Sequence, residues 1–436
     1  MRKIFIPLFL VISINVIGQS ALDKKIAEGA KKLEPKLIVW RRDIHEHPEL
    51  GNLESRTAAL IAAHLNQLGL KVQTGIAHTG VVALLKGTRP GPVVALRADM
   101  DALPITETTN LPFTSKQRTI YNGAETGVMH ACGHDAHVAI LMGVAELLSS
   151  MKSEIKGTIK FIFQPAEEGV PRGEEGGAEL MVKEGVLNNP GVDAIFGLHI
   201  KSDFETGKLG YKRGGLYAAV NDMKIIVTGK PSHGAYPWQS VDPIIVAAQI
   251  INNIQTIVSR NVDLTKNPAV ISIGAINGGN RQNIIPEKVE MLGTIRTFSY
   301  SDEEMIIKRI HTIVTKTAEA AGAKAEAIIP YASHYPVTMN DTALTLKMLS
   351  SLKQAAGASN VELMNGYTGA EDFSFYEQKI PGMFFILGGM PKGNNPADAA
   401  PHHTAAFMID ESSFVLGVKA LSTLALDYLN KPLPKK

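Results

Sequence analysis

The sequence predicts an α/β protein whose main sheet is mixed, mostly parallel and covered by helices. Short runs rich in β-branched and aromatic residues alternate along the chain with longer runs of helical periodicity. This alternation is typical of parallel strands that are joined by helices. With 436 residues, 45% of them hydrophobic, the chain is long enough for two or three domains that each bury a core.

The first 20 residues have the pattern of a secretory signal peptide. A short basic start precedes an apolar run that ends near Gly18, and small residues follow it. A buried or membrane helix is the alternative, but Pro7 and Asn15 interrupt the run, which is short for a membrane span. We therefore expect an exported protein, periplasmic or secreted, with no stable membrane insertion after cleavage.

The next elements follow from their apolar periodicity. A helix is expected at Glu34–Glu46, with Pro35 in its first turn, and a second at Ser55–Leu68, which Gly69 ends. A third helix starts at Gly133. The expected strands lie near Val72 and at Val81–Leu85, Val93–Leu96, Gly157–Ala166 and Val192–Leu198.

A separate pattern runs from about Asp222 to Tyr331. Its elements follow the ferredoxin-like order β-α-β-β-α-β. They are expected at Met223–Thr228, Val241–Val258, Ala269–Ile276, Val289–Phe298, Glu303–Ala321 and Ala323–Ile329. Because this pattern interrupts the chain, we expect residues 216–331 to be a domain inserted into one formed by residues 21–215 and 332–436.

Charge and cysteine content exclude some classes of function. The net charge is only +2, and no basic patch is interleaved with aromatic residues, so the sequence does not indicate nucleic-acid binding. Cys132 is the only cysteine, which excludes an intramolecular disulfide bond.

Side chains that bind metals are concentrated between Met129 and His137. Cys132 and His134 offer a thiolate and an imidazole, which are first-choice ligands for zinc-like ions, and Gly133 lets the backbone bend both toward one point. A single buried cysteine usually behaves as a small hydrophobic residue, and neighbouring histidines often lie on a solvated face. The segment alone is therefore only a moderate indication of a metal site.

Further acids and a histidine follow the expected strands. Glu167 and Glu168 come after one buried strand, His199 after a second, and Asp99 and Asp101 after a third. Open α/β sheets place their active sites at the carboxyl ends of such strands. The sequence therefore predicts a metal site at this edge of the sheet.

Taken together, these segments resemble peptidase family M20, and more narrowly its amidohydrolase branch of hippurate hydrolases, auxin–amino-acid conjugate hydrolases and N-acyl-amino-acid deacylases. The resemblance covers nearly the whole chain after residue 20. Its motifs are Arg97–Pro104, Met129–His137, Gln164–Gly169, Gly197–His199, Gly229–Pro237, Val241–Pro243, Asn283–Pro286, Gly293–Arg296, Gly369–Phe373 and His403–Phe407.

The resemblance implies a zinc-peptidase-like catalytic domain with two divalent metal ions per subunit, zinc or manganese, with cobalt as an alternative. The implied ligands are Cys132, His134, Glu168, His199 and His403. Ala405 stands where the family usually has proline, and the spacing to Phe407 favours His403 over His402.

The resemblance also implies how water attacks an amide. Metal ions activate the water and polarise the carbonyl, and Glu167 acts as general base and then acid. Asp101 is expected to orient a ligand. His130 and His137 could orient a ligand in the same way. A packing or capping role for them agrees equally well with the sequence.

The inserted domain is expected to form a homodimer and to contribute to the site. By resemblance, His233 stabilises the developing oxyanion in the site of a partner subunit, and Asn283 and Arg296 hold the α-carboxylate of the substrate. Without the resemblance, His233 would be interpreted as a turn residue and Arg296 as an exposed strand residue.

We therefore expect a metal-dependent amidohydrolase that acts on N-acyl amino acids such as hippurate-like or N-acetyl conjugates. One alternative is a di- or carboxypeptidase of the same family, in which an aspartate bridges the metals; Cys132 and His134 favour the amidohydrolase branch. Another is an exported, non-catalytic metal- or peptide-binding protein, which the base Glu167 argues against. The sequence contains no Gly-Xaa-Ser-Xaa-Gly motif, so a serine hydrolase is not indicated.

Overall fold

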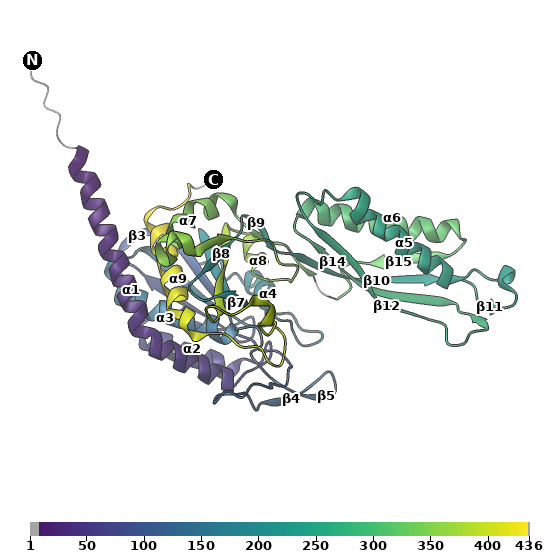
Figure 1. The fold of residues 1–436 in the computed structure, drawn as a ribbon, viewed down its shortest axis with the longest axis horizontal. Coiled ribbons are helices and arrows are strands. Elements are labelled where there is room, and N and C mark those ends of the chain that lie inside the picture. Colours follow the sequence, from purple (N-terminus) through teal and green to yellow (C-terminus); the bar gives the residue numbers. More distant parts are fainter. Residues whose placement is uncertain (1–7, 333, 435–436) are drawn as a thin grey trace, which may run out of the picture. The chain divides into compact units, whose positions relative to one another are not determined.

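The computed structural model describes residues 8–332 and 334–434 (Figure 1). Residues 1–7 of the expected signal peptide lie outside the described residues, and the side chains of residues 8–20 are not described. The chain forms two compact units. The first comprises Met1–Arg213, Asn340–Met364 and Tyr376–Lys436, and the second comprises Gly214–Met339 and Asn365–Phe375.

The first unit contains an eight-stranded sheet in the order β1-β2-β6-β3-β7-β19-β8-β18. Four of its seven neighbouring pairs are parallel, so the predicted mixed, mostly parallel sheet is confirmed. The strands are β1 Lys71–Ile76, β2 Gly80–Lys86, β3 Arg89–Asp99, β6 Lys156–Gln164, β7 Ala194–Glu205, β8 Leu209–Tyr211, β18 Val361–Leu363 and β19 Gly382–Met390. A separate hairpin is formed by β4 Arg118–Tyr121 and β5 Ala124–Gly127.

Helices cover this sheet. Helices α3 and α9 pack on β3, β6 and β7, and α1 packs against both helices (Figure 1). The helices are α1 Leu8–Glu46, α2 Ser55–Gln67, α3 His134–Ser150, α4 Gly177–Lys183, α7 Thr342–Ala356, α8 Ser374–Glu377 and α9 Phe414–Asn430. Within the described part of the chain, only Glu411–Asn430 is long and apolar enough to cross a membrane; 72% of it is buried, because α9 lies in the core.

Helix α1 is longer than the sequence predicted. The prediction that it begins at Glu34 was wrong, because the helix continues through Pro35 from Leu8. Ile26, Ala30 and Leu33 are spaced by three or four residues and are buried in the same core. This apolar face offsets the intrahelical hydrogen bond that proline removes.

A buried ion-pair network joins α1 to the first turn of α3. Arg41 Nε donates a hydrogen bond to Asp135 Oδ2 at 2.8 Å, and His45 Nδ1 lies 2.7 Å from the same oxygen. His45 Nε2 is 3.2 Å from Glu107 Oε1. All four side chains are buried or nearly so, and the network fixes the start of α3 against α1.

The second unit has the predicted β-α-β-β-α-β order. Its sheet runs β12-β14-β10-β15, so β10, the first strand along the chain, lies between the third, β14, and the fourth, β15. The short strand β16 pairs with β10 near its start. Helices α5 and α6 pack on this sheet (Figure 1). Its elements are β9 Gly214–Tyr217, β10 Ala219–Thr228, β11 Ser232–His233, α5 Pro243–Asn261, β12 Ala269–Gly278, β13 Ile284–Ile285, β14 Lys288–Thr297, α6 Tyr300–Ala320, β15 Lys324–Ile328, β16 His334–Tyr335 and β17 Thr338–Asn340.

The second unit also takes in Asn365–Phe375, a segment that lies outside the stretch 216–331 of the expected insertion. The backbone nitrogen of Ala218 donates to the carbonyl of Tyr367 at 3.0 Å. The rings of Tyr217 and Tyr367 stack with their centroids 5.3 Å apart. These contacts attach the later segment to the start of the unit.

Replacing His45 by glutamine is expected to lower the free energy of unfolding more at pH 6 than at pH 8.5. Burial opposes the charged imidazole, but the hydrogen bonds to Asp135 and Glu107 outweigh burial and raise the pKa of His45. A group whose pKa rises on folding stabilises the fold below its unfolded pKa of about 6.5, and this contribution is lost as the pH rises through the folded pKa. The loss at pH 6 should be about 1.5–3 kcal/mol, as for hydrogen bonds to charged groups.

Denaturant titration of both proteins at the two pH values measures this difference. The control is His47→Gln, because His47 is a nearby histidine that lies nearer the surface, with its Nδ1 3.7 Å from the carboxylate of Asp43. An effect of His45→Gln that is the same at both pH values would contradict the prediction.

Candidate metal centre and active site

The acids and histidines of the candidate site meet at one edge of the main sheet. Asp99 is the last residue of β3, and Glu167 and Glu168 follow β6. The ladder between β3 and β7 ends at Arg97 and Gly197, so His199 lies just beyond it. The prediction that the strand Val192–Leu198 ends before His199 was wrong, because β7 stays paired with β19 and continues to Glu205.

Cys132 and His134 lie at the start of α3, on either side of Gly133. Gly133 has φ 101°, in the left-handed region that favours glycine. A Cβ atom there would lie 2.5 Å from Cγ2 of Ile200. Only glycine therefore allows the turn that brings Cys132 and the first residue of α3 to the same edge of the sheet.

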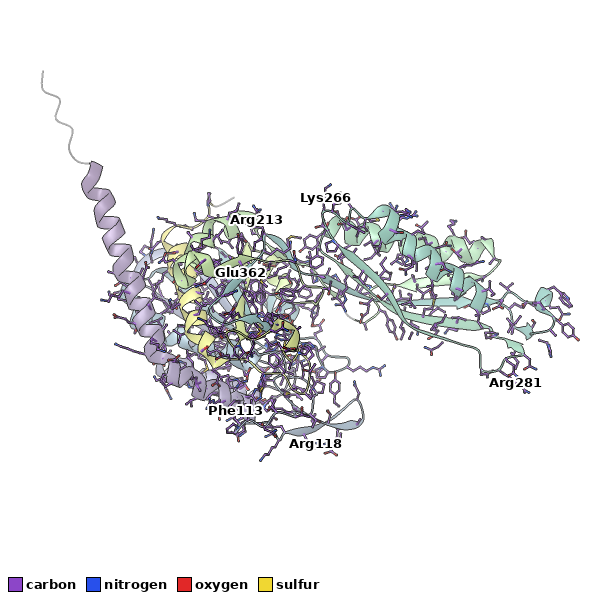
Figure 2. All side chains as sticks on the ribbon, viewed as in Figure 1. Phe113, Arg118, Arg213, Lys266, Arg281 and Glu362 are labelled. Atoms are coloured by element: carbon purple, nitrogen blue, oxygen red, sulfur yellow. The ribbon has the colours of Figure 1, made fainter. Side chains whose placement is uncertain are left out.

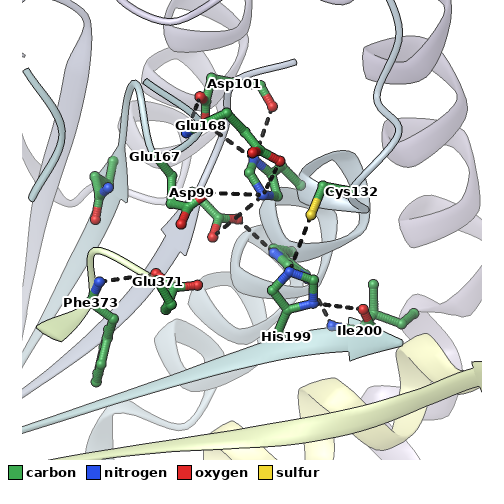
Figure 3. A network of polar contacts seen from close by, with 12 residues as sticks. Asp99, Asp101, Cys132, Glu167, Glu168, His199, Ile200, Glu371 and Phe373 are labelled. Atoms are coloured by element: carbon green, nitrogen blue, oxygen red, sulfur yellow. Dashed lines mark hydrogen bonds and ion pairs between the residues drawn. The ribbon is translucent and has the colours of Figure 1, made fainter. Parts of the chain in front are cut away.

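Cys132 faces His199 at the base of the site (Figure 3). Its Sγ lies 3.3 Å from His199 Nε2. His199 Nδ1 lies 2.7 Å from the carbonyl oxygen of Ile200, which only accepts, so Nδ1 carries the proton. Burial is the largest cause that lowers the pKa of His199 well below its usual value, and the neighbouring His137 is the second. The neutral ring therefore directs the lone pair of Nε2 toward the thiol.

His134 faces three carboxylates. Its Nδ1 lies 2.9 Å from the carbonyl oxygen of Asp101, to which it donates. Its Nε2 has no hydrogen-bond partner among the described residues. This nitrogen is 3.9 Å from an oxygen of each of three acids, namely Asp99, Glu167 and Glu168. Ligand atoms bound at about 2.0–2.2 Å to one zinc-like ion lie about 3–4 Å apart, so the spacing fits a cation.

Glu168 faces His403 in the same way. The two are separated by 3.0 Å between Oε1 and Nε2, and Glu168 Oε1 has no hydrogen-bond partner within the described chain. His403 has a left-handed φ of 62°, and its backbone nitrogen donates to the carbonyl of Ala131 at 2.8 Å. His402 instead packs on Phe407, with ring centroids 4.7 Å apart. The structure thus places His403, rather than His402, next to Glu168.

The five implied ligands form two overlapping groups. Cys132 belongs to both, with His134 and His199 in one and with Glu168 and His403 in the other. Within each group the ligand atoms lie within 4.8 Å of one another. The arrangement therefore fits two ions that share the neighbourhood of the thiol.

The electrostatics of the site also fit bound cations. Burial, and then the charges of Glu168 and Glu167, raise the pKa of the Cys132 thiol well above its usual value. Burial opposes a charge on His134, but Asp99 and then Asp101 outweigh it and raise its pKa to about 10. A divalent ion reverses both preferences, because it favours the thiolate and the neutral imidazole.

Asp99 is balanced by residues that the sequence did not single out for this role. Arg97 Nη1 lies 2.5 Å and His137 Nδ1 2.6 Å from its carboxylate oxygens. Burial opposes the charge, but Arg97 and then the histidines outweigh it and hold the pKa of Asp99 well below its usual range. His137 Nε2 accepts a hydrogen bond from the backbone nitrogen of Ile200 at 2.9 Å. Both nitrogens of His137 are thus engaged, and the residue links Asp99 to the strand that carries His199.

Asp101 contacts two of the implied ligands. Its Oδ1 is 3.1 Å from His134 Nδ1, and its Oδ2 accepts a hydrogen bond from the backbone nitrogen of Glu168 at 2.9 Å. Asp101 therefore contacts the side chain of one implied ligand and the backbone of another, and its orienting role stays a prediction. His130 is buried, and neither of its ring nitrogens has a hydrogen-bond partner among the described residues, so the structure gives it a packing position.

In the second unit, His233 and Asn283 lie together and Arg296 lies elsewhere. His233 pairs with Ile284, and the backbone nitrogen of Gly234 donates to the carbonyl of Asn283 at 2.8 Å. His233 follows the end of β10 and Asn283 precedes the start of β14, so both adjoin the pair of Thr228 and Lys288, whereas Arg296 lies eight residues further along β14, opposite Val220. At about 3.3 Å per residue, this separation is about 26 Å.

Figure 2 labels both ends of this unit. Lys266 marks the end at which β12 begins, and Arg281 marks the end that carries β11. Arg296 pairs with Val270 near the first end. The structure therefore brings His233 and Asn283 together but does not bring Arg296 to them within one chain.

Comparisons with known proteins agree with this geometry. The model of peptidase family M20/M25/M40 matches residues 95–427. The chain is 40% identical over 414 residues to thermostable carboxypeptidase 2 of Saccharolobus solfataricus, covering 94% of this chain and all of that protein. It is 38% identical over 401 residues to N-acetylcysteine deacetylase of Bacillus subtilis, covering 91% of this chain and 97% of that protein. The chain belongs to peptidase family M20.

A solved structure extends the comparison. The YXEP protein of Bacillus subtilis, described as a dinuclear metal binding peptidase from the M20 family, aligns with a TM-score of 0.75 and 37% identity, over 92% of this chain and 99% of that one. The predicted fold and the resemblance to family M20 and its amidohydrolases are thereby confirmed. The protein is a metal-dependent hydrolase of this family.

Replacing Cys132 by serine is expected to weaken the binding of both ions by at least about tenfold, because the thiol belongs to both ligand groups and a hydroxyl is a poor substitute for a thiolate. Metal analysis after equilibration in buffers of fixed free metal concentration measures the change. Met129→Leu, a conservative change at a buried neighbour, is the control and should keep both ions. Normal binding of both ions by the serine variant would make Cys132 only a packing residue.

Proposed function

We propose that this M20 hydrolase is an amidohydrolase that cleaves the amide bond of N-acyl amino acids. The observation that carries the proposal is the position of Glu167, a 6%-exposed carboxylate beside the two ligand groups. Its Oε2 lies 3.9 Å from His134 Nε2, and Glu168 next to it faces His403. One acid of the pair is thus available for metal binding and the other for proton transfer.

The residues have distinct roles in the proposed reaction. Divalent ions, when bound, supply an acidified water molecule and polarise the amide carbonyl. Glu167 takes a proton from the water while the water oxygen forms a bond to the carbonyl carbon. It returns the proton to the nitrogen as the carbon–nitrogen bond breaks, which releases a carboxylic acid and a free amino acid. Asp101 keeps His134 and the backbone of Glu168 in place throughout.

The relatives support two substrate classes. The similarity to N-acetylcysteine deacetylase supports N-acyl amino acids, and the higher identity to thermostable carboxypeptidase 2 supports peptides with a free carboxyl end as the second candidate. Hydrolysis of hippurate, N-acetyl amino acids and dipeptides by the metal-reconstituted protein, with and without a chelator, separates the two. The proposed function requires that the acylated amino acids are cleaved faster and that the chelator abolishes cleavage.

We further propose a homodimer in which His233 and Asn283 act in the site of the partner. The supporting geometry is the length of β14 in one chain: about 26 Å of strand separates Lys288, at the end near His233 and Asn283, from Arg296. The three side chains can reach one substrate only if two chains contribute. The loop beside His233 also exposes Trp238 to 74%, which suits a surface that is covered in an assembly.

The metal and the compartment complete the proposal. Thiolate and imidazole ligands favour zinc, whereas carboxylates also suit manganese, and cobalt is the third candidate. Export to the periplasm or beyond is supported by the signal-like pattern of the first 20 residues. Metal analysis of the protein purified from its native compartment tests both statements.

Replacing Glu167 by glutamine is expected to reduce turnover at least about a hundredfold, which is within the usual contribution of general base catalysis, while both ions stay bound. The glutamine side chain keeps the size of glutamate but cannot accept the water proton. Steady-state kinetics together with metal analysis measure both quantities. Activity close to that of the wild type, at normal metal content, would exclude Glu167 as the base.

Mixing two inactive variants tests the shared site. His233→Ala and Glu167→Gln are each expected to be nearly inactive alone. After subunit exchange, about half of the dimers should be mixed, and each mixed dimer should have one intact site, so about a quarter of full activity is expected. Each variant incubated with itself is the control. Absence of recovery after verified exchange would place His233 in the site of its own chain or outside the chemistry.

A further inference from the structure

Glu54 is a buried acid that the sequence did not mark as functional. It precedes the first residue of α2, yet its side chain does not cap this helix. Glu49 caps it instead, because its carboxylate accepts the backbone N–H groups of Arg56 and Thr57 at 2.9 and 2.8 Å. The carboxyl group of Glu54 is therefore free to serve another element.

That element is the loop that carries the two active-site acids. Glu54 Oε1 accepts a hydrogen bond from the backbone nitrogen of Ala166 at 2.8 Å, and Oε2 accepts one from Thr79 Oγ1 at 2.5 Å. Ala166 has φ 53°, a left-handed conformation that is uncommon for residues other than glycine. The hydrogen bond from Glu54 thus holds the strained residue directly before Glu167.

A second carboxylate holds the other side of Glu167. Asp101 Oδ2 accepts a hydrogen bond from the backbone nitrogen of Glu168 at 2.9 Å. The two N–H groups that flank Glu167 are therefore bound by two buried acids from different parts of the chain. Close packing adds to this, since a Cβ atom at Gly51 would lie 2.3 Å from the carbonyl oxygen of Gly169.

We propose that Glu54 is a positioning residue for the general base: by holding Ala166 in its left-handed turn, it sets the direction in which the Glu167 carboxylate points. The proposal rests on the proposed function, in which Glu167 transfers the proton. The hydrogen bonds of the Glu54 carboxyl group go to Ala166 and Thr79 and not to an implied ligand, so it acts through the backbone of the loop. A misplacement of about 1 Å at a reacting group costs up to about a hundredfold in rate, so such a role is measurable.

The experiment compares two substitutions at Glu54. Glu54→Ala should lower kcat by about ten- to a hundredfold, with KM within about twofold of the wild type and both ions bound, because the position of the base changes while the ligands stay. Glu54→Gln should keep at least about half of kcat, because its amide oxygen still accepts from Ala166. Burial and then the charge of Asp101 raise the pKa of Glu54 to about 8, so the uncharged amide is also the closer match at neutral pH.

Glu49→Ala is the matched control. It removes a carboxylate from the same loop and destabilises α2, but among the described residues the hydrogen bonds of this side chain go to Arg56 and Thr57 and not to the loop of Glu167. It should lower the melting temperature and keep kcat. Wild-type kcat in Glu54→Ala, or an equal loss in Glu54→Gln and Glu54→Ala, would overturn the proposal. If Glu54→Ala does not fold, Thr79→Val, which removes the hydroxyl that holds Oε2, should lower kcat several-fold, and an unchanged kcat overturns the proposal.

The double variant separates this proposal from the proposed function. If Glu54 acts through Glu167, then Glu54→Ala added to Glu167→Gln should cause no further loss of kcat. A further loss of tenfold or more overturns the positioning role. An active Glu167→Gln variant instead overturns the assignment of Glu167 as the base. If Glu167→Gln is inactive and Glu54→Ala keeps the kcat of the wild type, only the role of Glu54 is overturned.

Discussion

The rest of the structure depends on a concentration of buried negative charge at the carboxyl ends of β3 and β6. Asp99, Asp101, Glu167 and Glu168 meet there with the thiol of Cys132. Burying unpaired charges costs several kcal/mol each, so such a cluster persists only if cations or donors compensate it. Arg97 and His137 compensate Asp99, and the backbone N–H group of Glu168 together with His134 compensates Asp101. Divalent ions remain the natural partners of the acids and the thiol that face one another.

The histidines contribute through the placement of their protons. His134 and His199 each direct Nδ1 to a backbone carbonyl, which leaves Nε2 facing the cluster, where a bound cation would favour its unprotonated form. Their neighbour His137 reverses the pattern, because its Nε2 accepts from the backbone of Ile200 and is therefore not available as a ligand. Histidines thus divide into implied ligands and supporting residues according to the hydrogen bond made by the second ring nitrogen.

Much of this arrangement could be predicted from the sequence, because it follows from local patterns. Apolar periodicity located five of the eight strands of the main sheet and four of the five of the second sheet, whereas β8, β16, β18 and β19 were not predicted. The acids and histidines after the predicted strands lie together around Cys132 and Glu168. The start of α1 could not be predicted, since the propensity of Pro35 indicated a boundary that the packing of Ile26 and Ala30 overrides. The role of Glu54 could not be predicted either: its partner Ala166 is 112 residues away, and no spacing along the chain indicates a contact between a side chain and a distant backbone group.

Two residues with left-handed backbones show how the fold holds the reactive groups rigidly. Ala166 precedes the pair of glutamates, and His403 is itself an implied ligand. Such conformations cost about 1–3 kcal/mol in residues other than glycine and persist only where the surroundings determine them. Each residue is held by one hydrogen bond to another part of the chain. The backbone nitrogen of Ala166 donates to the Glu54 carboxylate, and that of His403 donates to the carbonyl of Ala131. Because the strain is balanced by these contacts before any ligand binds, the two loops meet the ions and the substrate in an already ordered form, and binding need not supply the free energy to order them.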